Sequence, residues 1–175
     1  SFEPFFKSEK TFLYKLAVKD RGEDAGYIDK SWKLFQKGYN NYPLNNIFGY
    51  YGTMHDGPVW PLYLEPKDLP LAPTWLIDFP PSGDRIGECI TYSHTKKEIL
   101  ILCGRMSKYW SRGVKILEQL LPKYHYDIEK IKNIGVAKAV GIQFQSGYNI
   151  IKFYCLREEL PYQPQKKQLK TIEKM

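Results

Sequence analysis

The spacing of apolar residues along the chain predicts two amphipathic helices. The first covers Ile28–Gln36, where Ile28, Trp32 and Phe35 recur at intervals of four and three. The second covers Ser107–Leu121, and its apolar stripe consists of Met106, Trp110, Val114, Leu117 and Leu121. In both segments the spacing places the apolar side chains on one helix face, so each helix is expected to pack against a core.

Short apolar runs bounded by turn residues predict strands. The run Ala139–Cys155 consists of two apolar stretches joined by Ser-Gly-Tyr-Asn, which predicts a pair of strands. Within it, Val140, Ile142 and Phe144 alternate with small or polar residues, the period of a half-buried strand. The remaining expected strands are Phe12–Val18, Ile47–Thr53, Thr74–Phe79, and a hairpin formed by Glu88–Ser93 and Glu98–Cys103.

The order of these elements predicts an α+β fold. A strand and a helix are followed by several strands, a longer helix and a strand pair, with a further short helix expected around Asp127–Lys132. No parallel βαβ pattern occurs, so we expect a mainly antiparallel, curved sheet with two or three helices packed on one face. A single domain is expected over residues 1–162, and a basic tail, flexible or helical, over residues 163–175.

Composition favours a globular protein in a reducing compartment. Apolar residues make up 43% of the chain, and no apolar run approaches the roughly 20 residues of a membrane helix. The N-terminal residues lack the apolar segment of a signal peptide. Cys89, Cys103 and Cys155 are widely spaced within or beside apolar runs, which favours buried thiols over disulfides or a zinc site. We therefore expect a cytoplasmic or nuclear protein without a metal or cofactor.

The net charge of +7 indicates an anionic partner such as nucleic acid, a phosphorylated ligand or an acidic protein. Part of this charge lies on the second predicted helix, where Lys108, Arg112 and Lys115 share one face. Arg105 lies just before this helix. Such a basic face can contact phosphates. A charged, solvated face is also the ordinary state of a surface helix, so both interpretations stay open.

Trp60 is a candidate for stacking on a base. It lies between Val59 and Pro61 in a proline-rich segment, where an indole held on a stiff loop can stack on a base or attract a cationic ring. Tyr50, in the Tyr- and Asn-rich segment before it, and Tyr14 are further candidates. The alternative is that Trp60 fixes its loop to the core.

Several segments resemble the mRNA cap-binding translation initiation factor family, and they occur in that family's order. The resembling segments are PFFKSEKTFLYKLAV, KSWKLFQ, MHDGPVW, PTWLIDF, YWSRGVKILEQLL and AVGIQFQSGYNIIKFYC. The resemblance implies an α+β fold, a partner-binding surface at Trp32 and a stacking role for Trp60. Pro61 stands where the family has Glu, and Phe12 or Tyr14 would replace its first stacking Trp.

Three functions follow from these features. The first is a non-enzymatic module that binds RNA or a nucleotide by aromatic stacking and through basic side chains such as Arg105 and Arg112. The second is an adaptor that binds a partner peptide or helix through Trp32 and Phe35. The third is an enzyme acting on nucleic acid or a phosphorylated substrate, for which the candidate ionisable groups are His55, Asp56 and Asp84.

Overall fold

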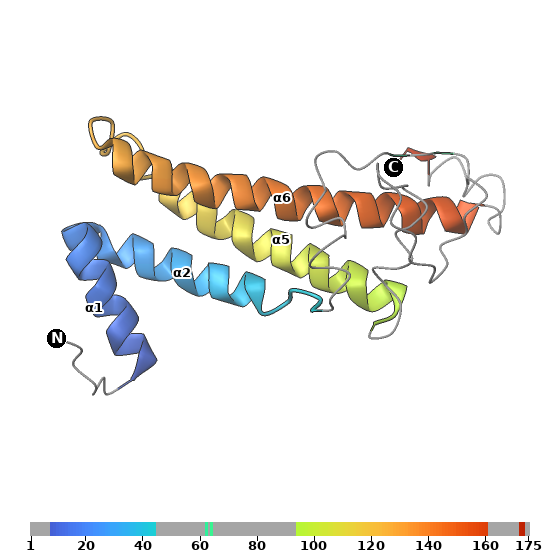
Figure 1. Ribbon diagram of the computed structural model, residues 1–175, viewed down its shortest axis with the longest axis horizontal. Helices are drawn as coiled ribbons and strands as arrows, with labels where there is room; N and C mark the ends of the chain where they lie inside the picture. Colours follow the sequence, from blue (N-terminus) through green and yellow to red (C-terminus); the bar gives the residue numbers. More distant parts are fainter. Residues whose placement is uncertain (1–7, 45–61, 63, 65–93, 161–171, 174–175) are drawn as a thin grey trace, which may run out of the picture. The chain divides into compact units, whose positions relative to one another are not determined.

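A computed structural model of the chain describes residues 8–44, 62, 64, 94–160 and 172–173. The main elements in these residues are helices (Figure 1). They are α1 (Glu9–Arg21), the 3₁₀-helix η1 (Gly22–Asp24), α2 (Ala25–Tyr39), α5 (Lys96–Glu118) and α6 (Ile128–Glu159). No strand occurs among the described residues, so the expected α+β fold with an antiparallel sheet is wrong.

Both amphipathic helices predicted from apolar spacing are confirmed. Ile28–Gln36 lies within α2, and Ser107–Glu118 forms the second half of α5. The short helix expected around residue 127 is confirmed as the beginning of the 32-residue α6. Helix prediction therefore succeeded where the apolar spacing covered several turns.

Each expected strand that the structure describes is helical. Phe12–Val18 lies in α1, Glu98–Cys103 lies in the first half of α5, and Ala139–Cys155 lies inside α6. The strands expected at Ile47–Thr53, Thr74–Phe79 and Glu88–Ser93 are outside the described residues, as are the predicted domain boundary at 162 and most of the tail.

Side-chain caps explain where α1, α5 and α6 begin. The Ser8 hydroxyl accepts a hydrogen bond from the Thr11 backbone N–H at 3.2 Å at the start of α1. At the start of α5, Thr95 and Glu98 form a reciprocal capping box: the Thr95 N–H donates to the Glu98 carboxylate (2.7 Å) and the Glu98 N–H donates to the Thr95 hydroxyl (3.2 Å). Asp127 accepts from the Lys130 N–H in the first turn of α6.

The described residues belong to two compact units. The first contains α1, η1 and α2 together with Lys108–Gly141, which comprises the second half of α5 and the beginning of α6. Its core consists of Ala17, Ala25, Ile28, Leu117, Leu120, Tyr124 and Ile134. Partly buried residues, Trp32 and Phe35 among them, pack against this core.

Glycine allows α2 and α5 to approach closely in the first unit. A Cβ atom added to Gly113 would lie 2.5 Å from Cε1 of Phe35, and the Ser31 hydroxyl donates a hydrogen bond to the Gly113 carbonyl. The same helix, α5, is joined to α6, because the Trp110 indole N–H donates to the Ala137 carbonyl at 2.8 Å. The inner side of α5 is thus fixed between two neighbouring helices.

The second unit contains the first half of α5 and the part of α6 that begins at Ile142. The Ser107 hydroxyl donates to the Gln145 side-chain oxygen at 2.6 Å, and a Cβ on Gly104 would lie 3.1 Å from the Tyr148 ring. The fully buried side chains of this unit include Ile99, Cys103, Met106, Ile151 and Tyr154.

Candidate nucleic-acid interface

Three cations of the first unit form the basic ridge, which we define as Lys108, Arg112 and Lys115 of α5. They are spaced four and three residues apart, so they share one helix face over roughly 10 Å of helix length. All three are exposed. The apolar stripe of α5 faces the core, because Val114 and Leu117 are buried, and the ridge therefore faces solvent.

No ion pair joins the basic ridge to any carboxylate in the described part of the chain. The carboxylate nearest in sequence on α5 is Glu118, three residues after Lys115, and it instead pairs with Lys138 of α6 at 2.8 Å. The positive charge of the ridge is consequently not neutralised by any side chain that the structure describes.

A fourth cation is contributed by α2. The Lys37 ammonium lies 4.5 Å from the ring centroid of Tyr109, which follows Lys108 on α5. Arg105 is exposed one turn before Lys108 on the same helix, in the part of α5 that belongs to the second unit. Within the first unit, cations thus occur both on α5 and at the end of α2 that contacts Tyr109.

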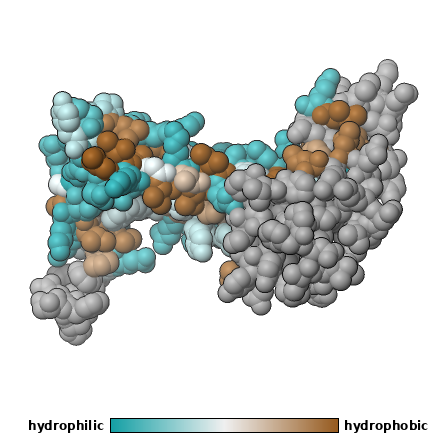
Figure 2. Space-filling model, turned by 45° about the horizontal axis from the view of Figure 1, so that its top comes forward, coloured by the Kyte–Doolittle hydropathy of each residue, from teal (hydrophilic) through white to brown (hydrophobic). Residues whose placement is uncertain are grey.

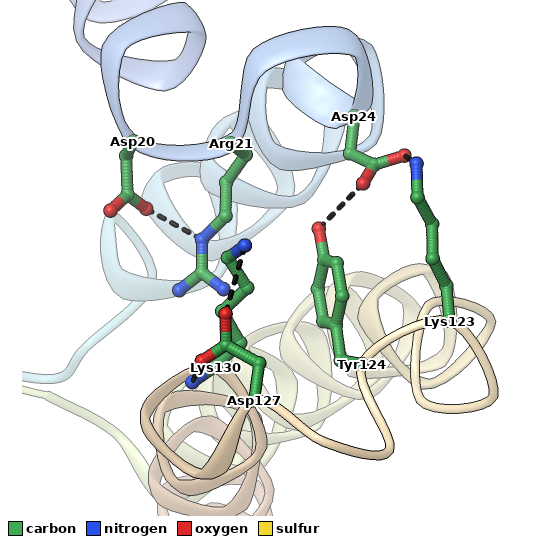
Figure 3. A network of polar contacts seen from close by, with 7 residues as sticks. All are labelled: Asp20, Arg21, Asp24, Lys123, Tyr124, Asp127 and Lys130. Atoms are coloured by element: carbon green, nitrogen blue, oxygen red, sulfur yellow. Dashed lines mark hydrogen bonds and ion pairs between the residues drawn. The ribbon is translucent and has the colours of Figure 1, made fainter.

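Charged side chains of the first unit also gather where η1 meets the turn between α5 and α6 (Figure 3). We call this set the charged corner: Asp20, Arg21, Glu23, Asp24, Lys123, Tyr124, Asp127 and Lys130. Asp24, which is 8% exposed, accepts hydrogen bonds from the Tyr124 hydroxyl and the Lys123 ammonium, both at 2.9 Å. Lys123 also pairs with Glu23 at 2.6 Å. These contacts join residues about 100 positions apart in the sequence.

Two further ion pairs complete the charged corner. Arg21 pairs with Asp20 at 2.6 Å and Lys130 with Asp127 at 3.0 Å. The Arg21 guanidinium and the Lys130 ammonium also lie over the Tyr124 ring, at 5.6 and 4.9 Å from its centroid. The Tyr124 side chain is therefore held at its hydroxyl by Asp24 and at its ring by two cations.

The pKa shifts in the charged corner follow from this pairing. Burial raises the pKa of Tyr124, and with the hydrogen bond to Asp24 it reaches about 12. Burial also tends to raise the pKa of Asp24, but hydrogen bonds from Lys123 and Tyr124 outweigh it, so the pKa lies below its ordinary value. Hydrogen bonds to Glu23 and Asp24 raise the pKa of Lys123.

A cleft of about 630 Å³ opens at the charged corner, but its charges already satisfy one another. Lys123 is paired with Glu23 and Asp24, and Lys130 with Asp127. The Arg21 Nη1 atom has no hydrogen-bond partner, but it is buried and so offers no surface to a ligand. The charged corner is a structural connection between two parts of the first unit.

The structure places the predicted site residues in different surroundings. Arg105 and Arg112 are exposed on α5, and Tyr14 is 49% exposed on α1. Trp32 is half-buried against the core, and Phe35 stacks on Trp110 with ring centroids 4.4 Å apart.

Trp60, Tyr50, His55, Asp56 and Asp84 lie outside the described residues. Stacking by Trp60, Tyr14 or Tyr50 and partner binding by Trp32 and Phe35 stay predictions. The charged corner was missed, because no sequence signal links Asp24 to Tyr124.

Comparison with known proteins finds no family model, no curated protein and no solved structure that matches this chain. None of the helices described in the structure is both long and apolar enough to cross a membrane. Among the described residues, no cluster of His, Cys, Asp or Glu has the arrangement of a metal site. The Cys103 side chain is buried and that of Cys155 is half-buried.

Proposed function

We propose that the protein binds RNA through the basic ridge of α5. The observation that supports this proposal is that Lys108, Arg112 and Lys115 are exposed on one helix face, with no ion pair to any described carboxylate. Unpaired cations in a row can replace the counterions of a phosphate backbone, and this exchange supplies most sequence-independent affinity for nucleic acid.

The chemistry of the ridge favours a phosphate backbone over a protein surface. Stable protein interfaces have an apolar centre and are depleted in lysine. Between Lys108 and Lys115, the exposed positions of α5 carry only the three cations, and the apolar side chains face inward. The ridge therefore offers charge and hydrogen-bond donors without an apolar anchor.

The proposal is tested by the salt dependence of RNA binding. Fluorescence anisotropy with labelled single-stranded RNA and with an RNA duplex compares the full chain with the variant Lys108→Gln, Arg112→Gln, Lys115→Gln. If each cation neutralises one phosphate, the slope of log affinity against log salt falls by about 0.7 per contact on a single strand, or roughly 2 in total. A separate Arg105→Gln variant measures the contribution of the exposed cation in the second unit.

A matched control removes the same charge elsewhere. Lys10, Lys96 and Lys97 are exposed and form no ion pair within the described residues, so their replacement by glutamine changes net charge equally. The control is expected to keep the wild-type salt slope. Equal losses in both variants would show that net charge alone attracts RNA and would contradict a site on α5.

A further inference from the structure

Helix α1 carries large apolar side chains on its outer surface. Tyr14, Leu16 and Val18 are 49%, 41% and 43% exposed, and Phe12 is 37% exposed, whereas Ala17 between them is fully buried. In the space-filling view, apolar and polar residues lie side by side over this helix, at the lower left (Figure 2). Four exposed large apolar residues within seven positions indicate an interaction surface.

The position of Ala17 fixes the arrangement of this surface. Leu16 and Val18 precede and follow Ala17, so each is rotated by about 100° from the buried side, in opposite directions. Lys15 and Lys19 are two residues from Ala17 and so lie roughly opposite it, facing solvent. The outer face of α1 is thus a pair of lysines flanked by apolar residues on both sides.

Lys15 and Lys19 are not neutralised by any residue that the structure describes. Both are exposed, and neither forms an ion pair with a described carboxylate, since Asp20 at the end of α1 pairs with Arg21. An occupant of this face must therefore supply carboxylates or phosphates in its middle and apolar side chains at its edges.

Charge and geometry distinguish between the candidate occupants. A second copy of the chain would bring like charges together, because a two-fold symmetric contact pairs the same face with itself. A membrane-surface helix keeps its lysines on the side away from the lipid, whereas here Lys15 and Lys19 lie between the apolar residues. A nucleic-acid backbone would leave the apolar residues without a partner.

We propose that the outer face of α1 binds an acidic, apolar-rich peptide segment of a partner protein. The carboxylates of such a segment pair with Lys15 and Lys19, and its apolar side chains cover Leu16 and Val18. Segments of alternating acidic and apolar residues are commonly disordered alone and become ordered on binding. This inference is independent of RNA binding by α5.

The test uses the full chain and a synthetic peptide in which glutamate alternates with leucine and phenylalanine, with binding measured by fluorescence anisotropy. Two double variants are compared with the wild type: Lys15→Glu with Lys19→Glu, and Leu16→Ser with Val18→Ser. Each is expected to bind the peptide at least about tenfold more weakly, as for central contacts of a small interface. Circular dichroism checks that both variants keep the wild-type helix content.

Matched controls change the same residue types elsewhere. Ile128→Ser with Val136→Ser alters two apolar residues of α6 that are 66% and 63% exposed, and Lys96→Glu with Lys97→Glu reverses two exposed lysines of α5. Both controls are expected to bind the peptide as the wild type does, and a glutamate–serine peptide is expected to bind poorly.

Three results would overturn the inference. These are equal binding of the glutamate–serine peptide, unchanged binding by the α1 variants, and an α1-dependent attachment to phosphatidylserine vesicles or an RNA duplex without peptide binding. The first would indicate charge attraction alone, the second another surface, and the third a lipid or nucleic-acid partner.

Discussion

The charged corner and the basic ridge contain the same kinds of side chain but differ in pairing. At the charged corner, Lys123 contacts Glu23 and Asp24, and Lys130 contacts Asp127. On the ridge, Lys108, Arg112 and Lys115 contact no described carboxylate, and nearby Glu118 pairs with Lys138. Pairing, more than the number of charges, thus separates the side chains that stabilise the fold from those available to a partner.

The largest expected effect is the loss of Asp24. The Asp24→Ala variant leaves the buried Tyr124 hydroxyl without its acceptor and removes a partner of Lys123. Hydrogen bonds to a charged group contribute about 1.5–3 kcal/mol each, so we expect the free energy of unfolding to fall by roughly 3 kcal/mol in urea titrations. Glu129→Ala breaks an exposed pair with Lys132 and should cost less than about 0.5 kcal/mol.

A second expected effect concerns alkaline pH. The folded protein keeps the Tyr124 proton up to a pKa of about 12, whereas the ordinary value is 10.0, so the unfolded chain loses that proton first. The contribution of Tyr124 to the free energy of unfolding is therefore fully present below pH 10. It falls as pH rises toward 12, by roughly 2–3 kcal/mol in total.

The Tyr124→Phe variant tests whether the loss of stability at alkaline pH comes from the Tyr124 hydroxyl. It lacks the hydroxyl, so the part of the alkaline destabilisation that depends on Tyr124 should disappear, at a cost of about 1.5–3 kcal/mol at neutral pH for the lost hydrogen bond to the Asp24 carboxylate. Urea titrations at pH 9 and above 11 compare the two proteins. If both lose stability equally over this range, the hydrogen bond between Tyr124 and Asp24 does not control the titration.

A smaller effect is expected at the exposed member of the charged corner. The Lys123 side chain is 47% exposed, and ion pairs at the surface contribute about 0–1 kcal/mol. Lys123→Gln should therefore lower the free energy of unfolding by clearly less than Asp24→Ala does at low salt, and by less still in 1 M salt, where surface charges are screened. A loss as large as that of Asp24→Ala would mean that Lys123 is the main contact.

The smallest effect on stability is expected at the basic ridge. Replacing Lys108, Arg112 and Lys115 by glutamine breaks no described ion pair, so the free energy of unfolding should change by no more than about 0.5 kcal/mol. Relief of repulsion between like charges makes a slight gain the expected direction. A clear destabilisation would show that the ridge contributes to the fold.

The sequence predicts α2 and the second half of α5 because their apolar residues follow the helical period over several turns. It wrongly predicts strands within α6, because six residues around Ile142 also alternate between apolar and small or polar with a period of two. The glycines added to this error, since Gly141 fits a small position of the alternating strand pattern and Gly147 lies in the Ser-Gly-Tyr-Asn stretch expected to join the two strands. In the structure, Gly141 is buried within α6, and a Cβ there would lie 3.1 Å from the Trp110 ring.

The start of α5 had a usable signal in Thr95-x-x-Glu98, the capping-box pattern. It was interpreted as a hairpin loop because apolar runs lie on both sides. Of the candidate sites, the basic face of α5 follows from sequence because all its members share one helix. The charged corner does not, because it depends on tertiary contacts between residues about 100 positions apart.

The different roles of the charged corner and the basic ridge can be separated by measuring two quantities, the free energy of unfolding and the affinity for single-stranded RNA. Both are determined for Asp24→Ala and for the triple glutamine variant of the basic ridge. We predict that Asp24→Ala loses roughly 3 kcal/mol of stability while its folded fraction binds RNA as the wild type does. The ridge variant should keep its stability and lose the salt-dependent binding. Wild-type RNA affinity in the ridge variant would contradict the account.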